Sequence, residues 1–467
     1  MTTSNITKSP MSVHFSGVGG KGIAPAASLA LAAGLRVTGD DLAANHRTEA
    51  FSAVGVPVTL GVNRAPDDAD LIVSSAAVPA RDHVAVPHMA RLEFVQHLLS
   101  GHGKRILAVA GSLGKSTAAT MIHRILSSTA PSAYIGADVP GMLCGGELAA
   151  GEWAVVEACE YRSAYNALTP EIVVCLNMVQ NHEDDLGAGT AGFERSFTRF
   201  LAEGPTPPGL AVMPAEVAGL MAPRLADAGA SVRVEAIGAG APWQVEVLSQ
   251  VADGSTFRLT HRGKDAGTWT VPAPGAHLIP GAACGIVSAL RIGMSMAEIR
   301  AGLSRFRLPG RRMSVMHADE RLVVIDDNAR QPGQVKALVQ ALRQAHPDRA
   351  LVIAVSPWGR RNKRDLSAWP QALAGADGVW VLPVGDNAVP GGEDPDADIR
   401  LAEMLRASGT AAHVVGHDTD LTGTLLERRG GGLVVATAGY DANVAQFSDL
   451  HQRAVTAFAD EPQEAGR

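Results

Sequence analysis

One stretch, Arg105–Thr117, constrains the fold of this chain more than any other. It is an apolar run that breaks at Gly111, passes through Ser-Leu-Gly-Lys-Ser-Thr and continues as a helical pattern to Leu126. The pattern predicts a buried strand, a tight glycine turn and a helix. Such a turn directs successive backbone N–H groups and the positive end of the helix dipole at one point, where a polyphosphate binds.

The residues of this turn predict nucleotide binding. Lys115 would neutralise phosphate charge, and the hydroxyl of Ser116 would be a Mg²⁺ ligand. The turn matches the short pattern GxxGKS, whereas the longer GxxxxGK[ST] requires a glycine where Val109 stands. The alternative is a lysine that caps an ordinary strand-to-helix turn, but the strand before it and the helix after it favour a phosphate site. The predicted nucleotide-binding residues of the turn are Gly111, Ser112, Gly114, Lys115, Ser116 and Thr117.

A second glycine turn lies near the start of the chain. A predicted strand at Ser12–Ser16 precedes Gly17-Val-Gly-Gly-Lys-Gly22, and a helix and a second strand then lead to Asp40 and Asp41. This order is the Rossmann nucleotide arrangement, in which glycines let the backbone approach a diphosphate. The alternative is that the glycines serve only helix-to-strand packing. The predicted substrate-binding residues here are Gly17, Gly19, Gly20, Gly22, Asp41 and Ser74.

The remaining sequence alternates strand and helix patterns, which predicts an α/β protein. Its 467 residues exceed what one core usually supports, so we expect three domains. Runs at 231–237, 243–251 and 255–262 predict a small antiparallel sheet within the central domain. The expected domains are a Rossmann-like N-terminal domain at 1–103, a central domain with a P-loop ATPase-type parallel sheet at 104–308, and a Rossmann-like C-terminal domain at 309–467.

Composition excludes several classes of function. A net charge of -7 and a pI near 6.1 give no support for binding to nucleic acid or to an anionic membrane. No secretory leader opens the chain, and no apolar run reaches the roughly 18 residues of a membrane span. The cysteines form no CxxC pair, which argues against a zinc site and a disulfide framework. We expect a soluble cytoplasmic protein, either a monomer or a homodimer.

Two polar residues follow apolar strands of the central domain. Glu157 ends the run Trp153–Glu157, and His182 follows the run Glu171–Asn177. Strands of one parallel sheet end at the same edge, so both side chains can reach a cation held by Ser116 and the phosphates. The alternative for His182 is an ordinary surface-loop histidine. We predict Ser116, Glu157 and His182 as ligands of Mg²⁺, with Mn²⁺ as the alternative because histidine is unusual for Mg²⁺.

Two phosphate-binding turns and a hinged third domain suit an enzyme that uses ATP to join a nucleotide-linked substrate to a second molecule. The chain resembles the Mur ligases of peptidoglycan synthesis, above all those that attach L-alanine or a recycled tripeptide to UDP-N-acetylmuramate. His14–Gly22 is similar to their HFxGIGGxGM, Arg91–Phe94 to RAEML and Ala110–Thr117 to AGTHGKTT. The other similar stretches, in chain order, are Asp70–Ala76 to VVxSSAI, Val156–Glu160 to AEADE, Asn177–Asp184 to NIExDHxD, Gly310–Arg312 to GRR, and Asp326-Asp327 to DDYGHHP.

The resemblance implies a chemistry and a set of roles. ATP phosphorylates a carboxylate to an acyl phosphate, an amine attacks it, and the products are an amide, ADP and phosphate. The cofactors would be ATP and Mg²⁺, and the partners would be a small carboxylate and an amino-acid-like amine, with the N-terminal turn holding a UDP-type diphosphate. By position, Lys115, His182 and Arg311 would be catalytic, Asp327 would hold the ATP ribose, Arg311 would lie near the phosphates, and Arg330 would contact substrate.

The departures from the family motifs cluster at the predicted nucleotide and amine sites. Both asparagines of GxHNxxN, and the aromatic residue and both histidines of DDYGHHP, are absent. The altered positions lie in Gly275–Gly281, in Asp326–Pro332, in Pro357–Arg364 for PHRFTRTR, at Asn181 before His182, and at Cys159 and Arg162 in EADESD.

These changes favour a diverged amide ligase of specialised metabolism over the wall-synthesis step. Three alternatives stay open. The first is ligation of L-alanine to UDP-N-acetylmuramate, and the second is a catalytically silent binding protein with the same fold. The third is activation of a carboxylate for a reaction other than intermolecular amide formation.

Overall fold

The computed structural model describes residues 11–61, 66, 68–74, 86–179, 191–203, 208–356, 366–383, 396–421, 432–439 and 444–459. The chain forms two compact units. The first comprises Met1–Val247, Phe257–Val271 and Leu278–Pro309, and the second comprises Leu248–Thr256, Pro272–His277 and Gly310–Arg467.

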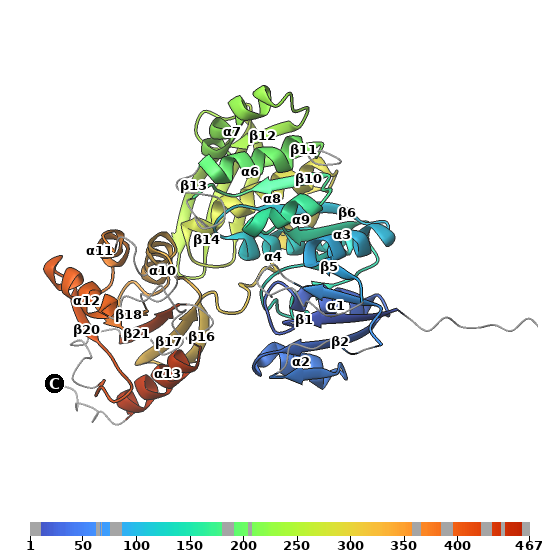
Figure 1. Ribbon diagram of the computed structural model, residues 1–467. Coiled ribbons are helices and arrows are strands. Elements are labelled where there is room, and N and C mark those ends of the chain that lie inside the picture. The colour runs from blue at the N-terminus through green and yellow to red at the C-terminus, as the bar shows by residue number, and fades with distance from the viewer. Residues whose placement is uncertain are drawn as a thin grey trace, which may run out of the picture. The chain divides into compact units, whose positions relative to one another are not determined.

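The N-terminal sheet has five parallel strands in the order β3-β2-β1-β4-β5. Figure 1 labels its strands β1, β2 and β5. Its central strand β1 is buried along its whole length, as expected for a parallel strand covered on both faces. Chain order places α1 after the glycine turn, and α1 packs against α3. The elements are β1 (Ser12–Ser16), α1 (Ala24–Ala32), β2 (Arg36–Asp41), α2 (His46–Ala53), β3 (Val58–Leu60), β4 (Leu71–Ser74), β5 (His88–Ala90) and α3 (Arg91–Gly101).

The second sheet has ten strands in the order β15-β14-β13-β12-β11-β10-β6-β9-β7-β8. Strand β6 lies between β9 and β10 and is parallel to both, so the ends of these three strands share one edge. The strands are β6 (Arg105–Ala110), β7 (Ser132–Tyr134), β8 (Gly146–Glu147), β9 (Trp153–Glu157), β10 (Ile172–Cys175), β11 (Leu210–Pro214), β12 (Arg233–Ile237), β13 (Trp243–Val251), β14 (Gly254–His261) and β15 (Lys264–Val271).

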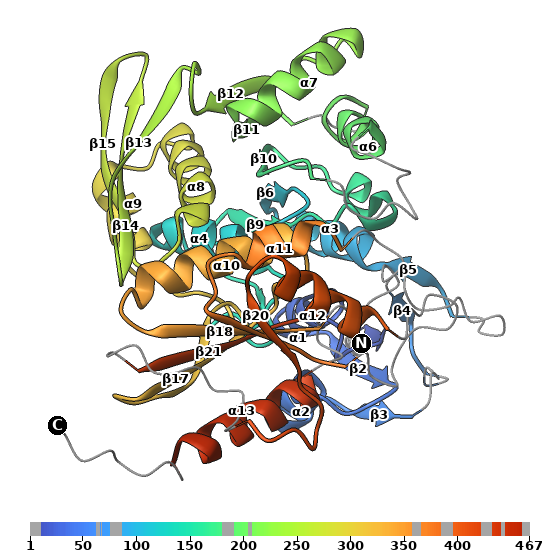
Figure 2. The same ribbon diagram turned by 90° about the vertical axis from the view of Figure 1, so that its left-hand side faces the viewer.

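One part of the predicted antiparallel sheet is wrong. The segment at 231–237 forms β12, which is parallel to β11 and extends the main sheet. The small antiparallel sheet consists instead of β13, β14 and β15, which lie side by side in Figure 2 and continue the same sheet. Alternation of side chains predicted strands here, but only pairing between distant strands decides which sheet each one joins.

Helices cover this sheet, and α4 packs against α8 because glycines allow a close approach. A Cβ atom at Gly285 would lie 2.8 Å from Cγ1 of Ile122. One continuous apolar cluster includes Val13 of the first sheet and Val173 of the second, so the two sheets share a core. The helices of this part are α4 (Lys115–Ile125), α6 (Ala191–Ala202), α7 (Ala215–Asp227), α8 (Ile279–Arg291) and α9 (Met296–Leu303).

The second unit contains a six-stranded sheet in the order β16-β17-β21-β18-β19-β20. All neighbours are parallel except the edge strand β16, which is antiparallel to β17. Apolar clusters cover both faces of the sheet. Its elements are β16 (Ser314–Ala318), β17 (Leu322–Asp327), α10 (Pro332–Ala345), β18 (Ala350–Val355), α11 (Ala368–Leu373), β19 (Gly378–Val381), α12 (Ala397–Ala407), β20 (Ala411–Val414), β21 (Leu433–Ala438) and α13 (Val444–Ala459).

In the described part of the chain, three mainly parallel sheets, the second of which continues into the small antiparallel part, confirm the predicted α/β class. All four cysteines are free thiols, as expected. Within the described part of the chain, no helix combines the length and the apolar character that a membrane crossing requires.

His123 on α4 gives the first unit a pH-dependent stability. Its side chain is buried, Nε2 donates to the carbonyl of Pro131 at 3.1 Å, and burial lowers its pKa to about 4. Below the ordinary pKa of 6.5 this histidine takes up a proton in the unfolded chain, whereas in the folded chain it stays neutral down to about pH 4. Its contribution to stability is therefore complete above pH 6.5 and is lost as the pH falls toward 4. We expect acidification from about pH 7.5 to about pH 5 to cost about 2 kcal/mol of unfolding free energy through this residue.

Urea titrations at the two pH values check this prediction with His123→Gln, which keeps a donor but cannot titrate. The variant should lose about 2 kcal/mol less than the wild type on acidification. The matched control is His102→Gln, three residues before β6 on the exposed surface, and it should behave as the wild type. Equal acid sensitivity of His123→Gln and the wild type would contradict the assignment.

Candidate functional site

The loop between β6 and α4 has the backbone that its glycines permit. Gly111 and Gly114 have φ angles of +133° and +79°, which side chains disfavour. The segment after β10 braces the loop. The Leu113 N–H donates to Oδ1 of Asn177 at 2.9 Å, and the hydroxyl of Ser112 donates to the carbonyl of Val179 at 2.6 Å. The predicted phosphate turn is therefore a fixed loop, and Ser112 serves as part of its frame.

Lys115 is the first residue of α4, and its side chain curls back over this loop. Its Nζ lies 2.7 Å from Oε2 of Glu160 and donates to the carbonyl of Gly111 at 2.6 Å. Burial alone would lower the pKa of Lys115, but the Glu160 carboxylate raises it above its usual value, so the ammonium stays charged. Ser116 and Thr117 follow in the first turn of the helix and are both buried.

Glu157 lies at the same edge of the sheet as this loop. Glu157 is the last residue of β9 and pairs with Val109 of β6, which stands two residues before Gly111. Its Oε2 accepts a hydrogen bond from the Gly136 N–H at 2.8 Å. A Cβ atom at Gly136 would lie 3.3 Å from the carbonyl of Lys21 in the N-terminal turn. Within the first unit, Gly136 thus lies between Glu157 and the N-terminal glycine turn.

The aspartates at the end of β2 hold the N-terminal turn. The N–H groups of Gly17 and Val18 donate to the carbonyl of Asp40, and that of Gly19 donates to Oδ2 of Asp41 at 2.8 Å. Side chains already fill part of the turn, because a Cβ atom at Gly19 would collide with Asn45. Gly20 follows in the same turn, and Ser74 ends β4 at the same edge.

Several predicted residues lie outside the described ranges. They include His182 and Asn181, together with the stretch 357–364. Among the residues that the structure does describe, no three His, Cys, Asp or Glu side chains gather as a metal site. Coordination of a cation by Glu157 with His182 therefore stays a prediction.

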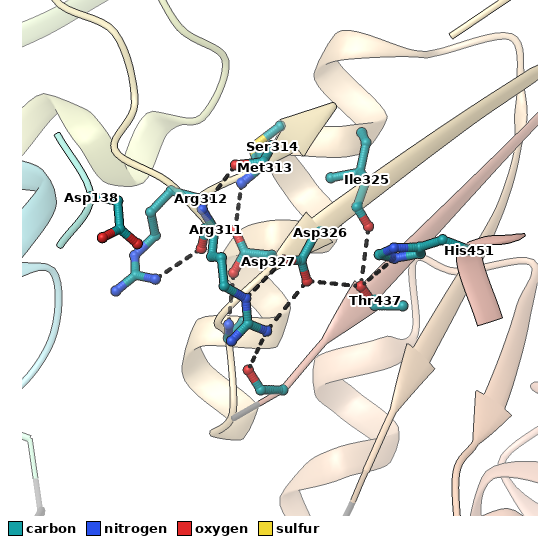
Figure 3. A network of polar contacts seen from close by, with 12 residues as sticks. Asp138, Arg311, Arg312, Met313, Ser314, Ile325, Asp326, Asp327, Thr437 and His451 are labelled. Carbon is teal, nitrogen blue, oxygen red and sulfur yellow. Dashed lines mark hydrogen bonds and ion pairs between the residues drawn. The ribbon is translucent and has the colours of Figure 1, made fainter. Parts of the chain in front are cut away.

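Arg311, predicted to lie near the phosphates, belongs to a buried network in the second unit (Figure 3). Nε of Arg311 donates to Asp326 at 2.8 Å, and Asp326 accepts from the hydroxyl of Thr437 at 3.1 Å. That hydroxyl has one proton to give, so it accepts from Nε2–H of His451 at 2.9 Å. Burial lowers the pKa of His451, which keeps the ring neutral and suits this arrangement.

Asp327 holds the backbone on either side of β17. Its two carboxylate oxygens accept from the N–H groups of Met313 at 2.8 Å and Ala329 at 2.7 Å. Arg311 and Met313 have φ angles of +54° and +49°, a strained conformation that such fixed contacts maintain. Ribose binding by Asp327 and phosphate contact by Arg311 stay predictions, and Arg330 lies exposed just beyond β17.

Thr437→Val is expected to lower the free energy of unfolding by about 1–3 kcal/mol, because Nε2–H of His451 loses its acceptor and Asp326 loses a donor. Urea unfolding measures the change. Thr456→Val is the matched control, since that exposed hydroxyl only donates to a carbonyl of its own helix, and it should change stability by no more than about 0.5 kcal/mol. Equal effects of the two substitutions would show that the network contributes nothing.

Sequence patterns missed the partners of the predicted residues. Glu160 lies three residues beyond β9, so the argument applied to Glu157 could have found it. Tyr134 ends β7, a three-residue strand with too little sequence to signal a site. Thr437 and His451 reach Asp326 only through the pairing of β17 with β21 and the position of α13, for which no local signal exists.

Comparisons with known proteins agree along the chain. The family model "Mur ligase family, catalytic domain" matches residues 12–102, and the model "Mur ligase, glutamate ligase domain" matches residues 311–440. The UDP-N-acetylmuramate–L-alanine ligase of Xanthomonas euvesicatoria is 30% identical over 430 residues, which are 86% of this chain and 87% of that protein.

Two solved structures show the same fold. The UDP-N-acetylmuramate–alanine ligase of Thermotoga maritima has a TM-score of 0.78 at 21% identity, over 95% of this chain and all of that one. A murein peptide ligase of Psychrobacter arcticus has a TM-score of 0.65 at 22% identity, over 97% of this chain and 99% of the other. With the sequence match over most of both chains, these likenesses establish that the chain belongs to the Mur ligase family of ATP-dependent amide-forming ligases.

Proposed function

We propose that this chain activates a small carboxylate with ATP and couples it to an amino-acid-like amine in a specialised biosynthetic pathway. The observation that carries the proposal is the shared edge of the central sheet, where Lys115 and Glu157 follow neighbouring strands. A cation and a carboxylate at the edge where a glycine loop opens suit a nucleotide phosphate and its metal ion.

The chemistry follows from the weakness of a carboxylate as an electrophile. The carboxylate oxygen attacks the γ-phosphorus of ATP and ADP leaves, which converts that oxygen into part of a good leaving group. The amine then attacks the acyl phosphate, phosphate leaves, and the nitrogen loses a proton. Lys115 would turn from Glu160 toward the phosphates and stabilise their charge as the phosphoryl group moves.

The oxygen donors of this edge fit a hard divalent cation. Ser116 and the half-buried carboxylate of Glu157 would hold Mg²⁺ together with His182. When bound, the ion would supply charge that offsets the phosphates. The hydrogen bond from the Gly136 N–H fixes one oxygen of Glu157 and leaves the other available as a ligand.

A second candidate is ligation of L-alanine to UDP-N-acetylmuramate, which the names of the similar proteins favour. The altered motifs favour a different pair of substrates. Cys159 replaces an acid two residues beyond Glu157, and the segment Gly275–Gly281 has neither asparagine of the family motif.

The test supplies purified protein with ATP, Mg²⁺, UDP-N-acetylmuramate and L-alanine and measures ADP. We expect little release with this pair, and amine-dependent release with another carboxylate and amine from a panel of amino-acid-like compounds. Hydroxylamine in place of the amine should trap the acyl phosphate as a hydroxamate. Rapid, alanine-dependent ADP release would instead establish the second candidate.

A further inference from the structure

Arg91 lies where the edges of two parallel sheets meet. It follows β5 directly, at the edge of the first sheet that also carries the glycine turn and the end of β4. Its Nη1 donates to the hydroxyl of Tyr134, which ends β7 of the second sheet, at 3.4 Å. Ligands of open α/β sheets bind at this edge. A substrate that extends from the first sheet to the phosphate loop would therefore pass this guanidinium.

The N-terminal turn is shaped around the same side chain. A Cβ atom at Gly22 would collide with Nη1 of Arg91, so only glycine leaves room for the guanidinium. The hydroxyl of Tyr134 donates to the carbonyl of Gly22 at 2.7 Å and thereby fixes the turn beside it. The last glycine of the predicted diphosphate turn thus serves to admit a cation of the chain itself.

Among the described residues, those in direct contact with the Arg91 side chain carry no carboxylate. Among described residues its side chain contacts the Tyr134 hydroxyl and the Cys159 thiol, and the carboxylate of Glu157 acts on it only electrostatically. Burial raises the pKa of Tyr134 to about 12, so this neighbour is neutral at physiological pH. A half-buried guanidinium ordinarily pairs with a carboxylate.

The position of Arg91 in its helix adds to this imbalance. It is the first residue of the 11-residue helix α3, whose N-cap residue Ala90 offers no side-chain acceptor. A cation at that end opposes the helix dipole. The acidic residue of the first turn, Glu93, is exposed, so an anion beside Arg91 itself would be favoured by both the dipole and the guanidinium. Burial, the helix end and the neutral partners all call for a negative charge at the same point.

We propose that Arg91, supported by Tyr134, binds the carboxylate of the acid substrate and presents it to the phosphate loop. The inference rests on the proposed function and gives it a recognition element. Cys159 and Glu157 interact electrostatically with Lys115 as well as with Arg91. The carboxylate of the substrate would therefore lie between the cations of Arg91 and Lys115. Bidentate pairing with a planar guanidinium would also orient the oxygen that attacks phosphorus.

Cys159 provides a reporter beside Arg91, because it is partly exposed while the other three cysteines are buried. Iodoacetate and iodoacetamide both alkylate thiols, but only iodoacetate carries a carboxylate. Peptide mapping by mass spectrometry measures the rate at which each reagent alkylates Cys159. We expect Arg91→Met to lower the iodoacetate-to-iodoacetamide rate ratio by about tenfold or more; both reagents react with the same thiol, so the ratio cancels any change in its own reactivity. Arg91→Lys should retain much of the ratio. The control Arg36→Met, at the opposite end of β2 beside Asp68, should match the wild type.

Competing anions identify the group that is recognised. Lactate should slow labelling by iodoacetate in the wild type, and inorganic phosphate at equal ionic strength should do so less. An unchanged rate ratio in Arg91→Met, a Cys159 that neither reagent reaches, or protection by phosphate but not by lactate would each overturn the proposal. The labelling needs no ATP, so failure of the proposed ligase reaction would be recognised separately by its ADP assay.

Discussion

Lys115→Met is expected to weaken binding of a non-hydrolysable ATP analogue by about 10- to 100-fold and to lower amine-dependent ADP release by about 10²–10³-fold. The reason is that Lys115 is the predicted cation of the phosphate loop and is fixed at the first position of α4. Calorimetric titration measures the affinity without knowledge of the acid substrate. The matched control is Lys264→Met, an exposed lysine on β15, which should bind the analogue as the wild type does.

The same substitution affects stability, because it removes the cation that lies 2.7 Å from the buried carboxylate of Glu160. Breaking such a pair costs about 3–5 kcal/mol. The double variant Lys115→Met, Glu160→Gln should recover most of that stability and none of the nucleotide affinity. If Lys115→Met binds the analogue normally, the loop is not the nucleotide site.

Glu157→Gln is expected to raise the Mg²⁺ concentration for half-maximal ADP release by about 100-fold or more, because an amide replaces the carboxylate that we predict to bind the metal ion. Glutamine can still accept from the Gly136 N–H, so the local structure should persist. A series of ADP assays at increasing Mg²⁺ measures the effect.

Strand β9 itself supplies the control for this prediction. Glu152 precedes the strand at its opposite end, exposed and paired with Arg105 at 3.1 Å. Glu152→Gln should leave the Mg²⁺ dependence unchanged. A Glu157→Gln enzyme with wild-type Mg²⁺ dependence would remove Glu157 from the metal site.

Local patterns predicted the interior of this fold well. Ser12–Ser16 and Trp153–Glu157 have the predicted bounds because buried parallel strands form continuous apolar runs. Two edge strands escaped prediction. Both β5 and β16 have mostly exposed or partly exposed residues, so neither shows an apolar period.

The candidate site likewise contains residues that could be predicted from the sequence and residues that could not. The glycine loop and Glu157 could be predicted because each is tied to a strand end that the sequence marks. The partners that set their charge could not, since Glu160 meets Lys115 only after the chain leaves β9 and turns. Arg91 matched a family motif, but its role depends on Gly22 and Tyr134, which come from two different sheets.

The apolar cluster shared by the first two sheets limits how their domains can be exchanged between related proteins, in evolution or by engineering. A recombination point at Gly101–Lys104 looks natural in the sequence, yet it would divide one core between two parents. Chimeras that import a foreign N-terminal domain would need the matching apolar surface of its original neighbour. Point substitutions along the sheet edge leave this shared core intact, whereas exchange of the whole domain does not.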